Sequence, residues 1–153
     1  MNDARLFSFQ DDGSIPNNPS LPVLFYPGAF SAQPEKIEQF FQQHGWGNTW
    51  QGGVFGYHHY HSNTHEALGV VSGSARLQLG GEEGDIVSVK SGDVCVLPAG
   101  TGHFQCCIEI PFYFQYFRSV HFCLCQFAER DTAFRNDNNC PHARSCAICS
   151  SRS

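Results

Sequence analysis

Residues 53–66 read Gly-Val-Phe-Gly-Tyr-His-His-Tyr-His-Ser-Asn-Thr-His-Glu, and four of the chain's eight histidines lie among them. Side chains two residues apart on a β-strand point to the same face, so His59 and His61 are expected to point together. The polar residues 62–65 are typical of a hairpin loop, which would place Glu66 opposite His61 on the next strand. Two imidazoles and one carboxylate are therefore predicted to converge on one point.

Alternation of apolar and polar residues continues on the C-terminal side of this stretch. Residues 74–79, 85–90 and 94–97 are short candidate strands, and each is followed by a turn that contains glycine. Residues 23–26 form a further candidate strand before Pro27-Gly28. Many short strands at this spacing are typical of antiparallel sandwiches and barrels. The expected fold class is all-β, a small antiparallel β-barrel or jelly roll running from about residue 50 to 103.

One helix is predicted before the strands, over residues 34–44. Pro34 suits the first helical turn, where its missing N–H costs nothing. Ile37, Phe40, Phe41 and His44 recur at helical spacing and make one apolar stripe, and Gly45 can end the helix. The stripe is expected to pack against the sheet.

Two motifs give the chain a resemblance to a known family. Residues 53–73 match G-x5-H-x-H-x4-E-x6-G, and residues 92–103 match G-x5-P-x-G-x2-H. Both patterns resemble the two motifs of the cupins, and the resemblance covers roughly residues 5–103. Residues 57–66 and the turn-rich loop at residues 11–22 are most similar to the YjlB-like cupins. Cys107 stands where the family often has Asn. The resemblance implies a cupin barrel in which His103 joins the first three side chains, so that His59, His61, Glu66 and His103 bind one metal ion.

Three imidazoles and one carboxylate, with no thiolate, suit a divalent transition metal such as Fe, Mn, Ni, Co or Zn. The function expected first is that of a metal-dependent enzyme of dioxygenase type acting on an unknown small molecule. A metal-dependent isomerase or lyase, and a small-molecule-binding cupin without catalysis, are the alternatives. Phe55, Tyr57, Leu68 and Phe104 are candidate pocket walls. His58 and His65 are expected to support or flank the site and not to bind the metal.

Composition and charge argue against nucleic acid and membrane as partners. The net charge is −5 and the nine basic residues form no stripe, so nucleic acid is not expected as a partner. No apolar run approaches the length of a membrane span, and the first 13 residues lack the apolar core of a signal peptide. A cytoplasmic location is expected, where thiols stay reduced.

The C-terminal third differs in composition, because seven of the eight cysteines follow residue 105. Two interpretations of residues 104–153 stay open: a divergent closure of the barrel, or a sequence from an altered reading frame or a retained intron. The expected division is 1–49 as an N-terminal arm and helix packing on the barrel, 50–127 as the barrel and 128–153 as a disordered tail. A zinc knuckle at Cys140, His142, Cys146 and Cys149 is a minor alternative for that tail. An incompletely closed barrel would expose a sheet edge, which favours a homodimer.

Overall fold

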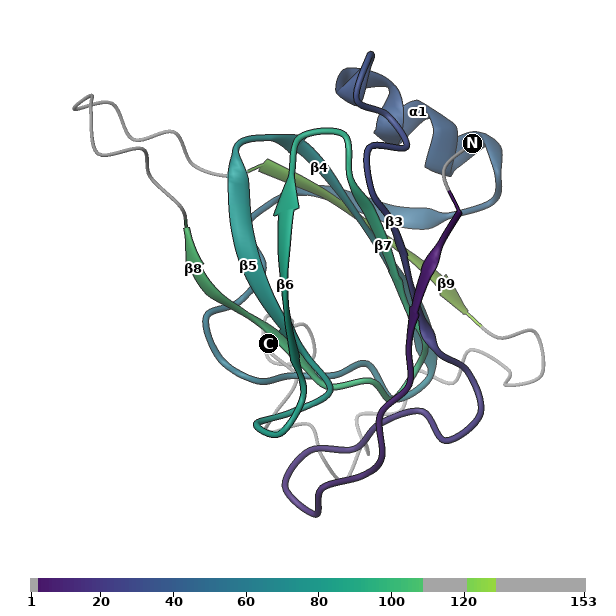
Figure 1. Ribbon diagram of the computed structural model, residues 1–153. Helices are drawn as coiled ribbons and strands as arrows, with labels where there is room; N and C mark the ends of the chain where they lie inside the picture. Colours follow the sequence, from purple (N-terminus) through teal and green to yellow (C-terminus); the bar gives the residue numbers. More distant parts are fainter. Residues whose placement is uncertain (1–2, 109–120, 129–153) are drawn as a thin grey trace, which may run out of the picture.

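The computed structural model of the chain describes residues 3–108 and 121–128, which form two antiparallel sheets and one short helix (Figure 1). The larger sheet has six strands in the order β1-β2-β7-β4-β9-β3, and the smaller has three in the order β6-β5-β8. The strands are β1 (Arg5–Phe7), β2 (Val23–Tyr26), β3 (Gly47–Gly52), β4 (Thr64–Ser72), β5 (Ser74–Leu79), β6 (Asp85–Lys90), β7 (Val94–Leu97), β8 (His103–Ile108) and β9 (His121–Ala128). The expected all-β fold class, with antiparallel sheets and one N-terminal helix, is confirmed.

In the smaller sheet, successive side chains point alternately to the core and to solvent. In β6, Val87 and Val89 are buried while Ser88 and Lys90 are exposed, as a half-buried strand requires. The turn that joins β5 to β6 contains Gly80, whose φ of 89° favours a residue without a Cβ. Strands predicted from period-two patterns at residues 74–79, 85–90 and 94–97 are all present.

The core lies between the two sheets, which face each other in Figure 1. Side chains of both sheets fill it, together with Val54 from the segment after β3; those of the sheets are Val23, Phe25, Leu68, Val70, Ala75, Leu77, Leu79, Val87, Val89, Cys95 and Leu97. Burial of this apolar area supplies the main favourable free energy of folding. Val54 also anchors the start of the histidine-rich segment in this core.

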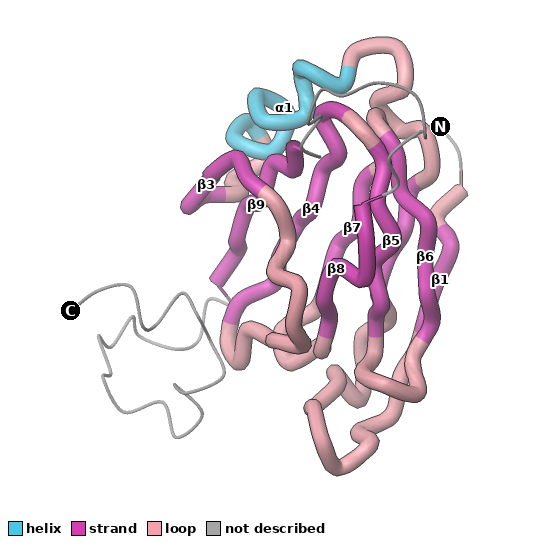
Figure 2. The backbone as a smooth tube through the Cα atoms, turned by 90° about the vertical axis from the view of Figure 1, so that its left-hand side faces the viewer, coloured by secondary structure: helices cyan, strands magenta, loops and turns pink. Residues whose placement is uncertain are grey.

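The N-terminal residues contribute strands as well as the helix. β1 pairs with β2, and β2 pairs with β7, so both strands extend the larger sheet. A single 3₁₀ turn, Pro34–Lys36, leads into the helix α1 (Ile37–Gln43), which confirms the helix expected over residues 34–44. Figure 2 shows α1 at one end of the strands, close to β3, β4 and β9.

The apolar stripe of α1 is narrower than the sequence predicted. Ile37 and Phe41 are buried against Ala67 and Val94, on the face of the larger sheet that points away from the core. Phe40 remains 43% exposed, and its ring stacks on that of His44. A helix of two turns has room for only one pair of inward positions, so the remaining two residues of the stripe stay at its edge.

The close approach of α1 to the sheet requires a glycine at position 69. A Cβ built there would overlap the Cγ2 atom of Ile37. Gly69→Ala is therefore expected to lower the free energy of unfolding by about 1–3 kcal/mol through overpacking. Gly56→Ala is the matched control, because nothing lies within 4 Å of its added Cβ, and it should change stability by less than ~0.5 kcal/mol. Urea unfolding of both variants measures the difference, and equal values for the two would contradict this packing.

The described residues of the C-terminal third form two strands of the fold. β8 continues to Ile108, and β9 (His121–Ala128) lies between β4 and β3 in the larger sheet. The disordered tail was predicted for residues 128–153, and its first residue, Ala128, instead ends β9. The rest of that tail, with the alternative zinc knuckle within it, lies outside the described residues. None of the helices in the described part of the chain is long and apolar enough to cross a membrane.

Candidate metal centre

Backbone pairing places His59 beside His103. The two residues exchange hydrogen bonds, His59 N–H to His103 O at 3.1 Å and His103 N–H to His59 O at 2.9 Å, as an isolated antiparallel bridge. Their rings lie 4.1 Å apart between centroids. Two histidines separated by 44 positions in the chain thus project from one point of the fold, as the resemblance implied.

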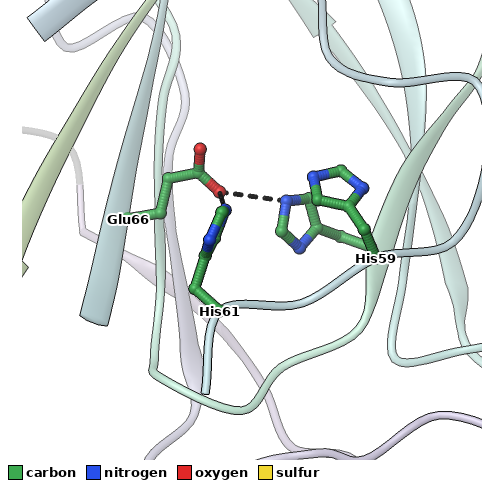
Figure 3. Close-up of side chains that lie close together, drawn as sticks. His59, His61 and Glu66 are labelled. Atoms are coloured by element: carbon green, nitrogen blue, oxygen red, sulfur yellow. Dashed lines mark ion pairs between the residues drawn. The ribbon is translucent and has the colours of Figure 1, made fainter. Parts of the chain in front are cut away.

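His61 and Glu66 reach the same region from different elements. The carbonyl of His61 accepts a hydrogen bond from the N–H of Gly100, in the turn before β8. Glu66 lies within β4, where it pairs with Leu97 on one side and Gln126 on the other. The two side chains point toward each other from the connecting segment and from the sheet (Figure 3).

The hairpin predicted between His61 and Glu66 is wrong, although the expected convergence occurs. Glu66 has β7 and β9 as its neighbours, so no ladder joins it to His61. Residues 53–63 pair instead with the segment around β8, through Phe55 O to Gln105 N at 2.9 Å and through the His59–His103 bridge. Both sides of β4 are occupied, by β7 and by β9, which excludes the connecting segment from that position in the sheet.

Four ligand-type atoms meet at the centre. One nitrogen each of His59, His61 and His103 and one carboxylate oxygen of Glu66 all lie within 4.8 Å of one another. Glu66 Oε2 is 3.3 Å from Nε2 of His61 and 3.0 Å from Nε2 of His103. All four side chains are buried. Two ligand atoms on opposite sides of one ion lie about 4.2 Å apart, because each bond is ~2.1 Å long. The four side chains therefore need to move together only slightly to bind a single ion.

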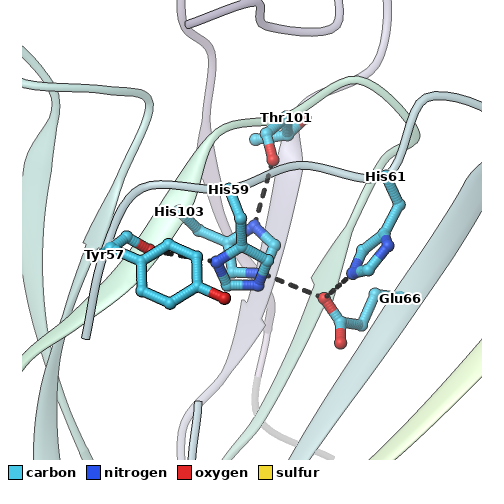
Figure 4. A network of polar contacts seen from close by, with 6 residues as sticks. All are labelled: Tyr57, His59, His61, Glu66, Thr101 and His103. Carbon is cyan, nitrogen blue, oxygen red and sulfur yellow. Dashed lines mark hydrogen bonds and ion pairs between the residues drawn. The ribbon is translucent and has the colours of Figure 1, made fainter. Parts of the chain in front are cut away.

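Backbone carbonyls fix which ring nitrogen faces the centre (Figure 4). Nδ1 of His59 lies 3.2 Å from the carbonyl oxygen of Tyr57, and Nδ1 of His103 lies 3.0 Å from that of Thr101. A carbonyl can only accept, so each Nδ1 carries the proton in the neutral ring. Each Nε2 then carries a lone pair directed at the centre, which is the orientation that metal-binding histidines require.

With these tautomers, a hydrogen-bond acceptor of His103 faces a hydrogen-bond acceptor of Glu66. Nε2 of His103 and Oε2 of Glu66 are buried 3.0 Å apart, and neither makes a hydrogen bond in the described part of the chain. With Nδ1 of His103 protonated, a neutral ring presents a lone pair to the carboxylate. A proton or a cation between the two atoms removes this repulsion, so the donor set fits a divalent metal ion.

The protonation states also suit a metal. Burial lowers the pKa of His59 to about 3, and repulsion from His103 in its protonated form acts in the same direction. Burial would raise the pKa of Glu66, but the His103 and His61 imidazoles in their protonated form favour the carboxylate more strongly and hold that pKa well below its usual range. At neutral pH His59 is therefore neutral and Glu66 is ionised, the forms in which both residues bind metals.

Metal-free protein is expected to lose stability in mild acid because of His59. Its pKa is about 3 in the folded state, against an ordinary value of 6.5, so the unfolded chain binds the extra proton as the pH falls below 6.5. The depressed pKa of Glu66 acts in the same direction below about 4.5. We expect a loss of about 2 kcal/mol between pH 7 and 4.5.

Urea unfolding in a chelator at both pH values measures this loss. His59→Gln removes the titrating ring and is expected to flatten the dependence. A wild-type protein as stable at pH 4.5 as at pH 7 would contradict the burial of a neutral His59.

The N-terminal loop supports the turn that carries His103. Asn17 is buried; its amide nitrogen donates to the carbonyls of Gln10 and Gly80, at 2.9 and 3.0 Å, and its Oδ1 accepts from Gly102 N–H at 3.3 Å. A Cβ on Gly102 would lie 2.8 Å from the side chain of Ile15. This role was not predictable from the sequence, because Asn17 and Gly102 are 85 positions apart and the residues around Asn17 indicate only turns.

The other residues singled out in the sequence lie around the centre and not in it. His58 packs edge-on against Phe104 at 4.3 Å, and burial lowers its pKa. His65 Nδ1 accepts from Ala99 N–H at 3.0 Å. Neither belongs to the four-residue group.

Of the four candidate wall residues, two lie against the centre. The rings of Phe55 and Tyr57 stack at 5.2 Å and contact His59, at 5.1 and 6.0 Å between centroids. Leu68 belongs to the core between the sheets. Nearby Cys95 is buried with a pKa raised to about 12 by burial and by the charge of Glu66, so its thiol stays protonated.

Comparison with known proteins relates the chain to one group. A family model described as Cupin matches residues 45–119. The uncharacterized protein YjlB of Bacillus subtilis is 46% identical over 101 residues, which cover 66% of this chain and 61% of that protein. The chain thus spans about three fifths of the length of that curated relative.

Solved structures show weaker likeness. A DUF861-family protein from Thermotoga maritima is 18% identical with a TM-score of 0.42, and the match covers 69% of this chain and 99% of that chain. Oxalate decarboxylase from Bacillus subtilis is 20% identical with a TM-score of 0.37, and the match covers 71% of this chain and 25% of that chain.

Proposed function

Because residues 45–119 match the cupin family model, we propose that the chain binds one divalent metal ion through His59, His61, Glu66 and His103 and acts with it on a small molecule. The observation that carries the proposal is the meeting of these four buried side chains within 4.8 Å. The carbonyl contacts of two of the rings support it, since they direct Nε2 toward the centre. Fe, Mn, Ni, Co and Zn are the candidate ions for such a donor set.

Each residue has a separate task in this proposal. The three imidazoles are neutral donors, and Glu66 supplies the only negative charge, so a divalent ion in the site would keep a net charge of about +1. The fold holds these groups in place before any ligand arrives, because His59 and His103 are hydrogen-bonded to each other through the backbone. Phe55 and Tyr57 cover His59 and limit access of water.

The reaction class that we propose first is of dioxygenase type. A redox-active ion such as iron would supply the electron transfer that reaction with oxygen needs, whereas zinc would supply Lewis acidity. The isomerase or lyase alternative uses only the second property. The binding alternative uses the charge of the ion to hold a ligand without turnover.

Oxygen uptake separates these classes. Protein loaded with Fe(II) or with Zn(II) is mixed with small hydroxy, keto and thiol acids in an oxygen electrode chamber, and products are followed by mass spectrometry. Uptake with Fe(II) and none with Zn(II) supports the dioxygenase type. Product formation without uptake favours the isomerase or lyase. The His61→Ala variant treated with the same ions is the control, and uptake equal to the wild type would contradict the proposed site.

We also propose that the protein forms a homodimer through a sheet edge. β1 and β6 are outer strands of their sheets, and each exposes one large apolar side chain: Leu6 is 63% exposed and Ile86 57%. Edge strands of this kind are templates for pairing with another chain. Light scattering should give twice the chain mass, and a monomer at high concentration would contradict the proposal.

A further inference from the structure

Gln105 carries a buried acceptor that the described part of the chain leaves unused. Its Oε1 is shielded from solvent and accepts no hydrogen bond from the described residues. An acceptor in this state destabilises the protein unless something outside the chain donates to it. The residue as a whole is only partly buried, so the terminal amide can turn about its last torsion toward an arriving ligand.

Strand alternation places this side chain on the same face as His103. In β8, His103 pairs with Leu79 and Gln105 pairs with Leu77, and both leucines are buried in the core between the sheets. The irregularity in this ladder comes after Gln105, so alternation holds between the two residues. Residues two apart on a strand are ~6.6 Å apart, so Gln105 stands one step from the proposed metal centre.

The aromatic wall of the centre is anchored to the same residue. The backbone N–H of Gln105 donates to the carbonyl of Phe55 at 2.9 Å. The Phe55 ring stacks on Tyr57 and packs edge-on against His59. Gly53 also lies close, since a Cβ there would be 3.9 Å from Oε1 of Gln105. The acceptor thus lies beside the segment that carries the rings covering His59.

We infer that Gln105 determines ligand specificity at this centre by accepting a hydrogen bond from the hydroxyl of a small hydroxycarboxylic acid. The inference rests on the proposed metal centre and names the ligand class for it. A net charge of about +1 favours a carboxylate at the ion and disfavours an ammonium group near it. The donor that Oε1 needs is therefore a neutral hydroxyl, and a step of ~6.6 Å limits the ligand to a few carbon atoms.

Two acids that differ by one hydroxyl test the inference. Propionate and 3-hydroxypropionate are titrated by calorimetry into Co(II)-loaded wild type, Gln105→Met and Gln51→Met. Met keeps the length of Gln and removes both polar atoms, and Gln105→Leu is a second apolar variant. Gln51 is the matched control, because it is an exposed glutamine on β3 that bonds to Glu38.

The wild type and Gln51→Met are expected to bind 3-hydroxypropionate ~3–10-fold more tightly than propionate, the usual effect of one hydrogen bond. In Gln105→Met and Gln105→Leu the ratio should fall to about 1–2 while Co(II) affinity is retained. An unchanged ratio in these variants, or no preference in the wild type, would overturn the inference.

The acids also separate this inference from the proposed function. Failure of the wild type to bind Co(II), seen before any acid is added, would overturn both. Normal Co(II) binding with neither acid bound would overturn the ligand class alone.

Discussion

Replacing His103 by alanine is expected to lower the affinity for Co(II) or Zn(II) by at least ~100-fold, more than the loss of a supporting contact costs a metal site. His103 lies nearest to Glu66 Oε2, at 3.0 Å, and its Nδ1 is held by the carbonyl of Thr101. Its loss removes one of four donors and leaves the remaining three without the backbone-fixed ring that faces them. The apolar core lies between the sheets and does not include His103, so the variant should stay folded.

Two histidines outside the group provide controls for this experiment. His44 is exposed at the end of α1, and His65 bonds to Ala99 N–H in the turn before Gly100. His44→Ala should bind metal as the wild type does, and His65→Ala should lose much less than His103→Ala. Competitive titration against a colorimetric chelator measures all three affinities. If His65→Ala lost metal as fully as His103→Ala, the assignment of the four ligands would be wrong.

Removing the metal is expected to lower the Tm by about 10 °C. A ligand present at a thousand times its Kd stabilises the folded state by about 4 kcal/mol, and each kcal/mol is worth about 2–4 °C in a chain of this size. The buried carboxylate adds a specific reason, since Glu66 faces Nε2 of His61 and of His103 and binding of a cation relieves their repulsion.

Glu66→Gln is the variant that tests this coupling. It keeps the shape of the side chain and removes its negative charge, so the metal-dependent shift in Tm should fall to a small fraction of the wild-type value. Calorimetric scans with and without a chelator, for wild type and variant, give the two shifts. A variant that responds to metal as strongly as the wild type would show that the stabilising ion binds elsewhere.

Local patterns in the sequence predicted the elements better than their pairing. The period-two runs at residues 74–79 and 85–90 became β5 and β6, because each strand buries one face against the core. The hairpin between His61 and Glu66 did not form, because β7 and β9 flank β4. Nothing local to residues 53–63 encodes their pairing with Gln105 and His103.

The candidate site was predictable only where a pattern repeats locally. The spacing of His59 and His61 was sufficient to expect both rings at one place, whereas His103 entered through the resemblance to cupins. Asn17 and Gln105 gave no signal, since an isolated amide in a loop or strand is ordinary. Their roles emerge from contacts across the fold, with Gly102 for the first and with Phe55 for the second.

Anomalous diffraction from crystals of protein grown with Co(II) or Zn(II) tests most directly whether four side chains hold one metal ion. We expect a single strong peak within ~2.0–2.2 Å of one nitrogen each of His59, His61 and His103 and of one oxygen of Glu66. Absence of a peak there, or a peak held by His58 or His65 in place of these residues, would contradict it.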